Sequence, residues 1–272
     1  MRDPIAITEM SELSEVHEFY EWSRDYWMDL SRSPDGTNSY VLNFGLWPPG
    51  TDNLYEAQQH LWDAAIGLLG EAGSHGRGLE VGCGIGGFAV KLARRNAVRL
   101  VCLDLLQEHL RLARIHAREE NVQDRIELRQ GSSMAIPLHD GAFDFVYCIE
   151  SSFHYPDKRR FLEEIHRVVK RGGVFVLADI TCENNALVTF RKGNYYPASA
   201  VFRQDILDAG FAIEHEVDIG ERVFVPLKDY VKRFNHGRRT KLAKYWELVL
   251  SNYAKLSQQH AMGYQLYRLR KD

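Results

Sequence analysis

The 272-residue sequence lacks most features of disulfide-linked, membrane-spanning or polyanion-binding proteins. Its only cysteines are Cys83, Cys102, Cys148 and Cys182, and they form no C-x-x-C pair, so we expect small buried side chains rather than disulfides or metal ligands. The absence of an 18-residue apolar run and of a charged-then-apolar leader favours a soluble cytoplasmic protein, neither exported nor membrane-bound. A formal net charge of −3 argues against a nucleic-acid partner.

Charge is unevenly distributed along the chain. Residues 1–60 carry 11 acidic and 3 basic side chains, whereas residues 221–272 carry 12 basic and 4 acidic ones. Both segments could simply be solvated faces. Alternatively, the N-terminal segment docks on the C-terminal one, in the same subunit or in a neighbouring one. The N-terminal helix or the basic insertion could then mediate homo-oligomerisation.

A glycine-rich turn is the most informative stretch of the sequence. The apolar strand end Gly78–Val81 is followed by glycine at positions 82, 84, 86 and 87 and then by a helical pattern. Glycine allows a positive φ and a close approach of a ligand to the main chain, and the helix N-terminus offers free N–H groups. The G-x-G-x-x-G spacing alone also fits a dinucleotide site. Glu80, however, suits a ligand with an ammonium and a sulfonium group better than a pyrophosphate.

Further motifs follow in order. The apolar run Val98–Asp104 ends in an acid placed to accept hydrogen bonds from ribose hydroxyls. The stretch Phe143–Asp157 reads F-D-F-V-Y-C-I-E-S-S-F-H-Y-P-D. A helix is expected over Arg160–Lys170 and should end at Gly172–Gly173, before the apolar strand that leads to Asp179. In these motifs the sequence resembles the class I S-adenosylmethionine-dependent methyltransferases, in particular the small-molecule and natural-product group. The matched motifs run from about residue 79 to 179.

The pattern of apolar residues predicts an α/β fold. Alternating strands and helices indicate a doubly wound, mostly parallel sheet. The resemblance implies a Rossmann-like sheet of seven strands that ends in an antiparallel hairpin. Residues 1–60, with a helix over Glu15–Leu30, are expected to form a helical cover or lid. Residues 61–272 are expected to form the cofactor-binding core, with insertions at about 181–199 and 222–260, the second containing one long helix over Tyr230–His260.

The predicted cofactor site lies beyond the carboxyl ends of the strands, where strand order reverses. The residues expected there, partly from the resemblance, are Glu80, Gly82, Cys83, Gly84, Gly86, Asp104, Leu105, His109, Ser132, Ser133, Met134, Ile149 and Glu150. Ser132 departs from the family, which usually has an aspartate there for the adenine amino group. As helix residues, His109 and His166 are expected to face solvent, although the resemblance puts His109 among the cofactor contacts.

Methyl transfer from a sulfonium is an in-line displacement that mainly needs alignment, which can be worth roughly 7–11 kcal/mol. His154 follows the fourth strand and is the candidate base; it could equally be a structural residue that orients a neighbour. Asp179 could orient His154, bind the acceptor, or form only a salt bridge or turn cap. Candidate substrate contacts are the aromatic residues Tyr20, Tyr26, Phe44, Trp47 and Tyr195. No metal-ligand spacing is present.

These features predict a methyltransferase that acts on a small, partly apolar metabolite or natural product through oxygen, nitrogen or carbon, with S-adenosyl-L-homocysteine as product. The alternative is a cofactor-binding protein of the same fold that does not methylate, such as a cyclase or a regulatory subunit. Nucleic-acid or protein acceptors are a third class. They are disfavoured because Glu150–Phe153 stands where base-amino methyltransferases have N-P-P-Y or D-P-P-Y.

Overall fold

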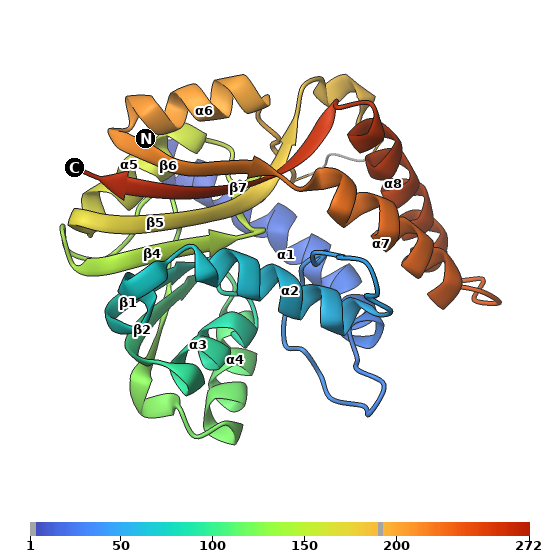
Figure 1. Cartoon of the computed structure of the whole chain (residues 1–272), viewed down its shortest axis with the longest axis horizontal. Coiled ribbons are helices and arrows are strands. Elements are labelled where there is room, and N and C mark those ends of the chain that lie inside the picture. Colours follow the sequence, from blue (N-terminus) through green and yellow to red (C-terminus); the bar gives the residue numbers. More distant parts are fainter. Residues whose placement is uncertain (1–3, 190–192) are drawn as a thin grey trace.

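The computed structural model describes residues 4–189 and 193–272 (Figure 1). Its strands are β1 (His75–Val81), β2 (Ala97–Asp104), β3 (Ile126–Gln130), β4 (Phe143–Ile149), β5 (Val169–Cys182), β6 (Phe211–Asp218) and β7 (Met262–Lys271). Its helices are α1 (Pro4–Leu30), α2 (Leu54–Gly67), α3 (Gly87–Arg95), α4 (Gln107–Glu119), α5 (Lys158–Val168), α6 (Ser199–Asp208), α7 (Gly220–Phe234) and α8 (Lys241–Gln258). No helix in this part of the chain is both long and apolar enough to cross a bilayer.

The seven strands form one sheet in the order β3-β2-β1-β4-β5-β7-β6. The first five are parallel, and β7 runs antiparallel between β5 and β6. The predicted fold class is therefore confirmed. Strand order reverses between the neighbours β1 and β4, so the carboxyl ends of these two strands mark the expected binding edge.

Helices cover both faces of the sheet (Figure 1). On one face, side chains of α2, α3 and α4 such as Leu61, Phe88 and Leu110 pack against the sheet. On the other, side chains of α5 and α6 such as Phe161 and Phe202 do so. Strand β4 is buried on both faces except at Asp144, which explains its nearly continuous apolar sequence.

Three predicted helix boundaries were wrong. Helix α1 begins at Pro4 rather than at Glu15. Helix α5 ends at Val168 because Val169 already pairs with Phe143, so the Gly172–Gly173 pair lies within β5 instead of ending the helix. The basic insertion contains two helices, because the chain turns between them at Gly237, which has a φ of 81°, and Thr240 caps α8 by accepting from the Ala243 N–H.

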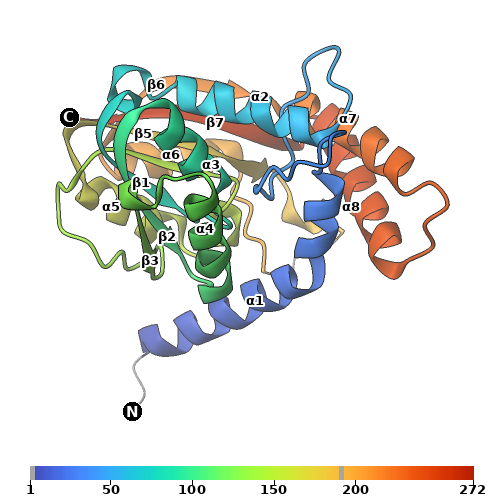
Figure 2. The ribbon, with the colours of Figure 1, turned by 90° about the horizontal axis from the view of Figure 1, so that it is seen from below.

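Helix α1 runs along one side of the molecule from α4 to α8 (Figure 2). It meets the basic C-terminal helices chiefly through aromatic side chains, with Trp22 edge-on to Tyr245 at 4.6 Å. An ion pair of 3.2 Å joins Arg238 to Asp29. The acidic and basic segments thus contact each other within one chain.

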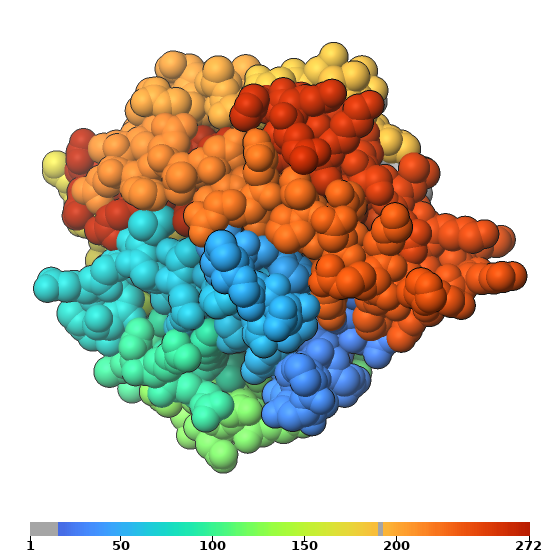
Figure 3. All heavy atoms as spheres, turned by 45° about the vertical axis from the view of Figure 1, so that its right-hand side comes forward, coloured from blue at the N-terminus to red at the C-terminus, as the bar shows by residue number. Residues whose placement is uncertain are grey.

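The segment between α1 and α2 lies against the α7–α8 pair, which projects from the rest of the molecule (Figure 3). Of the predicted 181–199 insertion, residues 190–192 lie outside the described residues, as do residues 1–3 of the predicted cover. A backbone hydrogen bond joins the two ends of the insertion, because the Cys182 N–H donates to the Pro197 carbonyl at 2.9 Å.

Candidate active site

The glycine turn between β1 and α3 has the backbone conformation predicted for it. Gly82, Gly84 and Gly86 have φ values of 71°, 52° and 84°, in the left-handed region that favours glycine. A Cβ on Gly82 would clash with the Ser151 side chain, whereas one on Gly84 would meet no atom within 4 Å. Gly84 therefore borders open space, and Gly86 forms the N-cap of α3. The turn leaves room for a ligand against its backbone.

Asp104 ends β2 and organises the side of the site next to α4. Its carboxylate accepts from the Gly84 N–H at 2.8 Å, the Leu106 N–H at 2.9 Å and His109 Nδ1 at 3.2 Å. Burial opposes ionisation of Asp104, but the interaction with His109 and the two backbone hydrogen bonds outweigh it and lower the pKa of Asp104. His109 is only 3% exposed, so the expectation that it faces solvent was wrong. His166, also expected at the surface, is partly buried and packs edge-on to Phe211.

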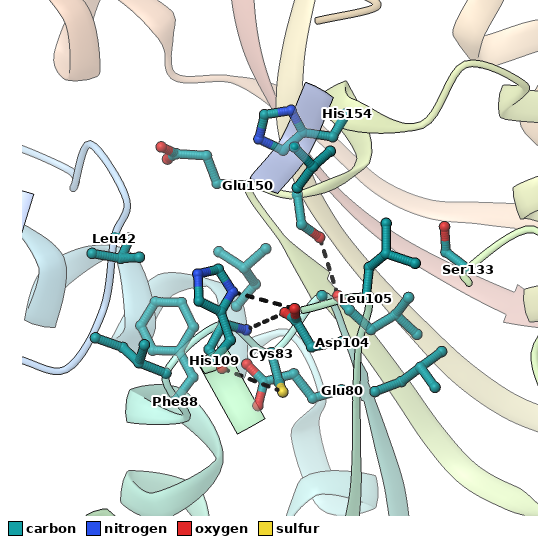
Figure 4. Close-up of a pocket in the computed structure, with 18 of the residues that line it drawn as sticks. Leu42, Glu80, Cys83, Phe88, Asp104, Leu105, His109, Ser133, Glu150 and His154 are labelled. Carbon is teal, nitrogen blue, oxygen red and sulfur yellow. Dashed lines mark hydrogen bonds and ion pairs between the residues drawn. The ribbon is translucent and has the colours of Figure 1, made fainter. Parts of the chain in front are cut away.

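Glu80 is the penultimate residue of β1 and lies deep in the site (Figure 4). It is 3% exposed, and its carboxyl accepts from the Tyr147 hydroxyl at 3.1 Å. Burial raises the pKa of Glu80 to about 8. A cationic ligand nearby would compensate the lost hydration and favour the ionised form.

The two serines after β3 differ in their hydrogen bonding. Ser132 Oγ accepts from the Met134 N–H at 3.2 Å and so closes the local turn. Ser133 Oγ is buried and has no hydrogen-bond partner. Ser133 therefore offers a free polar atom, while Ser132, in the slot usually held by aspartate, is partly engaged.

Glu150 and His154 lie across the cavity from Asp104 (Figure 4). Glu150 has a φ of 52°, and a positive φ at a non-glycine residue is a strain typical of functional sites. Its carboxyl oxygens each lie 3.0 Å from the Phe44 N–H, and one accepts from the Tyr264 hydroxyl at 2.9 Å. Burial raises the pKa of Glu150 well above its ordinary value.

His154 is held in a defined tautomer. Its Nδ1 lies 2.9 Å from the Gly193 carbonyl, which can only accept, so Nδ1 carries the proton. Nε2 is then an acceptor, and it lies 3.3 Å from the Tyr20 hydroxyl of α1. Burial lowers the pKa of His154 to about 4, so the ring is neutral near pH 7.

Asp179 in β5 is 1% exposed and supports the turn that carries His154. Its carboxylate accepts from the Phe153 N–H at 3.0 Å and the Ile180 N–H at 2.7 Å. It lines neither cavity described below. Of the roles predicted for Asp179, this geometry fits the turn cap.

Two cavities meet at the binding edge. The large cavity, about 840 Å³ up to its open mouth, borders the glycine turn and the ends of β1, β2 and β4. The predicted cofactor contacts that line it are Glu80, Gly82, Cys83, Gly84, Asp104, Leu105, His109, Ser132, Ser133, Ile149 and Glu150. Gly86 and Met134 do not line it, and no lysine or arginine of the described part of the chain does so.

The aromatic cavity lies between α1, the end of β5 and α8, and the empty space in and in front of it, open solvent included, is about 460 Å³. It is lined by Phe19, Tyr20, Trp27, Leu42, Phe44, Glu150, Phe153, Ile180, Asn194, Tyr196, Tyr245, Trp246, Val249 and Tyr253. Tyr20, Leu42 and Glu150 line both cavities, and we call these three residues the junction.

The predicted substrate contacts are only partly assembled. Tyr20 and Phe44 line the aromatic cavity. Tyr26 instead donates to Asn235, Trp47 donates to the Phe44 carbonyl, and Tyr195 is 41% exposed outside both cavities. The sequence placed the basic insertion among the pocket walls but pointed to no residue in it. Helix α8 of this insertion supplies Trp246, Val249 and Tyr253, which recur at helical spacing.

Comparison with known proteins places this geometry in a family. A family model described as a methyltransferase domain matches residues 79–177, from the glycine turn to β5. Residues 79–177 form a class I methyltransferase domain. The resemblance inferred from the sequence is thereby confirmed, with S-adenosylmethionine as the cofactor of the domain. No group of three or more histidine, cysteine or acidic side chains placed to hold a metal ion occurs among the described residues.

Relatives of the methyltransferase domain include natural-product enzymes. Erythromycin 3''-O-methyltransferase of Saccharopolyspora erythraea is 36% identical over 148 residues, covering 53% of this chain and 47% of that protein. The chain thus spans about half the length of this relative. The 27-O-demethylrifamycin SV methyltransferase of Amycolatopsis mediterranei is 26% identical over 85% of this chain and 89% of its own length. The crystal structure of the [4+2]-cyclase SpnF has a TM-score of 0.78 at 23% identity, covering 94% of each chain, and shows the fold alone.

The large cavity fits the cofactor of this domain. S-adenosylmethionine carries a sulfonium and an ammonium group, and the described residues of the cavity wall include acidic side chains but no lysine or arginine. Two of its buried polar atoms, His109 Nε2 and Ser133 Oγ, have no hydrogen-bond partner in residues 4–189 and 193–272. Such atoms are uncommon in folded proteins and are available to a polar ligand. Glu80, Asp104, the glycine turn and Ser133 would hold the cofactor.

Proposed function

We propose that this chain transfers a methyl group from S-adenosylmethionine to a small, partly apolar acceptor. The observation that carries the proposal is the pair of cavities that meet at Tyr20, Leu42 and Glu150. One cavity is acidic and borders the glycine turn, and the other is walled by aromatic side chains. When bound, the cofactor supplies an electrophilic methyl group. An acceptor in the aromatic cavity would meet this methyl group at the junction.

The chain's own contribution is alignment and the exclusion of water. Val16 and Tyr20 of α1 line the large cavity together with residues 40–43, so this cover closes one side of the site. Glu150 fastens the cover, because its carboxyl accepts from the Phe44 N–H. Holding two reactants in line in a closed site can account for much of a transfer rate.

His154 acts in this proposal as a positioning residue. Its neutral ring accepts from the Tyr20 hydroxyl and donates to the Gly193 carbonyl, which fixes Tyr20 at the junction. His154 lines the large cavity and not the aromatic one. If the acceptor must lose a proton, His154 Nε2 could take it only through Tyr20.

The test uses the purified chain. Calorimetry with S-adenosylhomocysteine should give micromolar binding, and NADH should not bind. Incubation with S-adenosylmethionine and an extract containing neutral natural products should then release S-adenosylhomocysteine and a product heavier by one methyl group. Binding of the cofactor product without any consumption of S-adenosylmethionine would instead support a cyclase or regulatory protein.

A further inference from the structure

The charge of the aromatic cavity restricts what it can bind. Among the described residues no lysine or arginine lines it, so this part of the wall would leave a phosphate or carboxylate on the acceptor without a counter-charge. Its acidic wall residue, Glu150, is already engaged by Phe44 and Tyr264. An anionic acceptor is therefore disfavoured.

Most hydroxyl groups of the cavity wall are paired inside the protein. Tyr196 and Tyr253 are hydrogen-bonded to each other at 2.7 Å, and Tyr20 is bonded to His154. Two wall residues differ. Trp246 Nε1 and Asn194 Oδ1 are buried atoms that have no hydrogen-bond partner among the residues that the structure describes. Buried polar atoms in native proteins are nearly always satisfied, so this pair points to a ligand.

The free indole N–H of Trp246 determines which kind of ligand atom can face it. Trp246 is 3% exposed, and its N–H can only donate. Its ring meets Trp27 edge-on at 4.8 Å and an angle of 81°, and it lies 6.0 Å from Phe19. This N–H is satisfied by a carbonyl, ether or hydroxyl oxygen of a ligand, whereas an ammonium group offers it no lone pair.

Resting on the methyl-transfer function proposed above, we propose that the acceptor is an uncharged, mostly apolar ring compound recognised by two polar contacts. An oxygen of the acceptor takes the hydrogen bond of Trp246 Nε1, and a hydroxyl or N–H group of the acceptor donates to Asn194 Oδ1. The aromatic walls contact its rings. Trp246 and Asn194 are thus specificity-determining residues that lie in the cavity but outside the methyl-donor site.

Three bicyclic probes test this assignment in the protein saturated with S-adenosylhomocysteine. 6-Hydroxy-1-tetralone is neutral and carries a carbonyl, 5,6,7,8-tetrahydro-2-naphthol lacks the carbonyl, and 6-hydroxy-2-naphthoate carries a negative charge. Calorimetry should show the tetralone binding about 3- to 10-fold more tightly than the naphthol, the range expected of one hydrogen bond. The naphthoate should bind at least about 10-fold more weakly than the tetralone.

Substitutions of Trp246 and Asn194 test whether these residues cause the preference for the tetralone. Trp246→Phe should bring the tetralone to the affinity of the naphthol, and Asn194→Ala should weaken both neutral probes equally. Trp62→Phe is the matched control, because its indole N–H donates to the Phe88 carbonyl away from the cavity, and it should leave the preference unchanged. If Trp246→Phe does not fold, the Asn194→Ala result and the wild-type ranking decide.

The remaining outcomes distinguish failure of the proposed function from failure of the proposed substrate class. If S-adenosylhomocysteine does not bind, the proposed function fails. Three results obtained with S-adenosylhomocysteine bound would leave the methyl-transfer proposal standing but refute this substrate class. The naphthoate could bind best, no probe could bind at millimolar concentration, or Trp246→Phe could keep the preference for the tetralone.

Discussion

Glu80 gives a sharp prediction for stability against pH. In the unfolded chain its carboxyl titrates near 4.5, whereas burial raises the pKa in the folded protein to about 8. Between these values the folded state keeps a proton that the unfolded state has lost, so stability falls as pH rises through this window. At pH 7 the loss from this group is about 3 kcal/mol, at 1.36 kcal/mol per pH unit.

Glu80→Gln removes the titration and keeps an amide oxygen that can accept from Tyr147. The variant should equal wild type near pH 4 and exceed its free energy of unfolding by about 3 kcal/mol at pH 7. Urea denaturation of both proteins at several pH values measures this difference, and other titrating groups cancel in it. Glu71→Gln, at an exposed position, is the control. Parallel curves for Glu80→Gln and wild type between pH 5 and 8 would refute a protonated Glu80.

Three further predictions concern the site. Gly82→Ala places a methyl group against the Ser151 side chain, at a residue whose φ is 71°. The Kd for S-adenosylhomocysteine should rise by about tenfold or more. A Kd within twofold of wild type would contradict the role of the turn. Asp104→Asn keeps the shape but cannot accept from all three of its donors, so calorimetry should show a similar loss, and unchanged affinity would remove Asp104 from the cofactor site. His154→Ala should lower kcat by about tenfold or more while leaving the affinity for S-adenosylhomocysteine within about twofold. Tyr20→Phe should do the same, because the two residues act as a pair. Unchanged kcat in both variants would make the pair structural only.

The sequence predicts well what depends on neighbouring residues. The glycine turn, the acid at the end of β2 and the turn with His154 are local patterns, and each lies at the predicted edge of the sheet. The strand order followed from the resemblance and from the alternation of elements. Only the boundaries shifted, where pairing of Val169 with Phe143 prevailed over the helical pattern.

The parts that depend on distant contacts could not be predicted. Trp27 and Trp246 meet at 4.8 Å although they lie on α1 and α8, and no periodicity within either helix shows which aromatic residues will face each other. The helical position of His109 suggested solvent, yet the carboxylate of Asp104 and the ring of Tyr20 cover it. The wall of the aromatic cavity is therefore a tertiary property.

The position of β7 has a consequence for synthesis on the ribosome. Strand β6 pairs only with β7, and Tyr264 of β7 supplies the hydroxyl that holds Glu150 at the junction. While the exit tunnel still holds β7, the parallel half of the sheet can form, but β6 has no neighbour and Glu150 lacks this bond. A nascent chain is therefore expected to acquire a complete junction only when β7 inserts between β5 and β6.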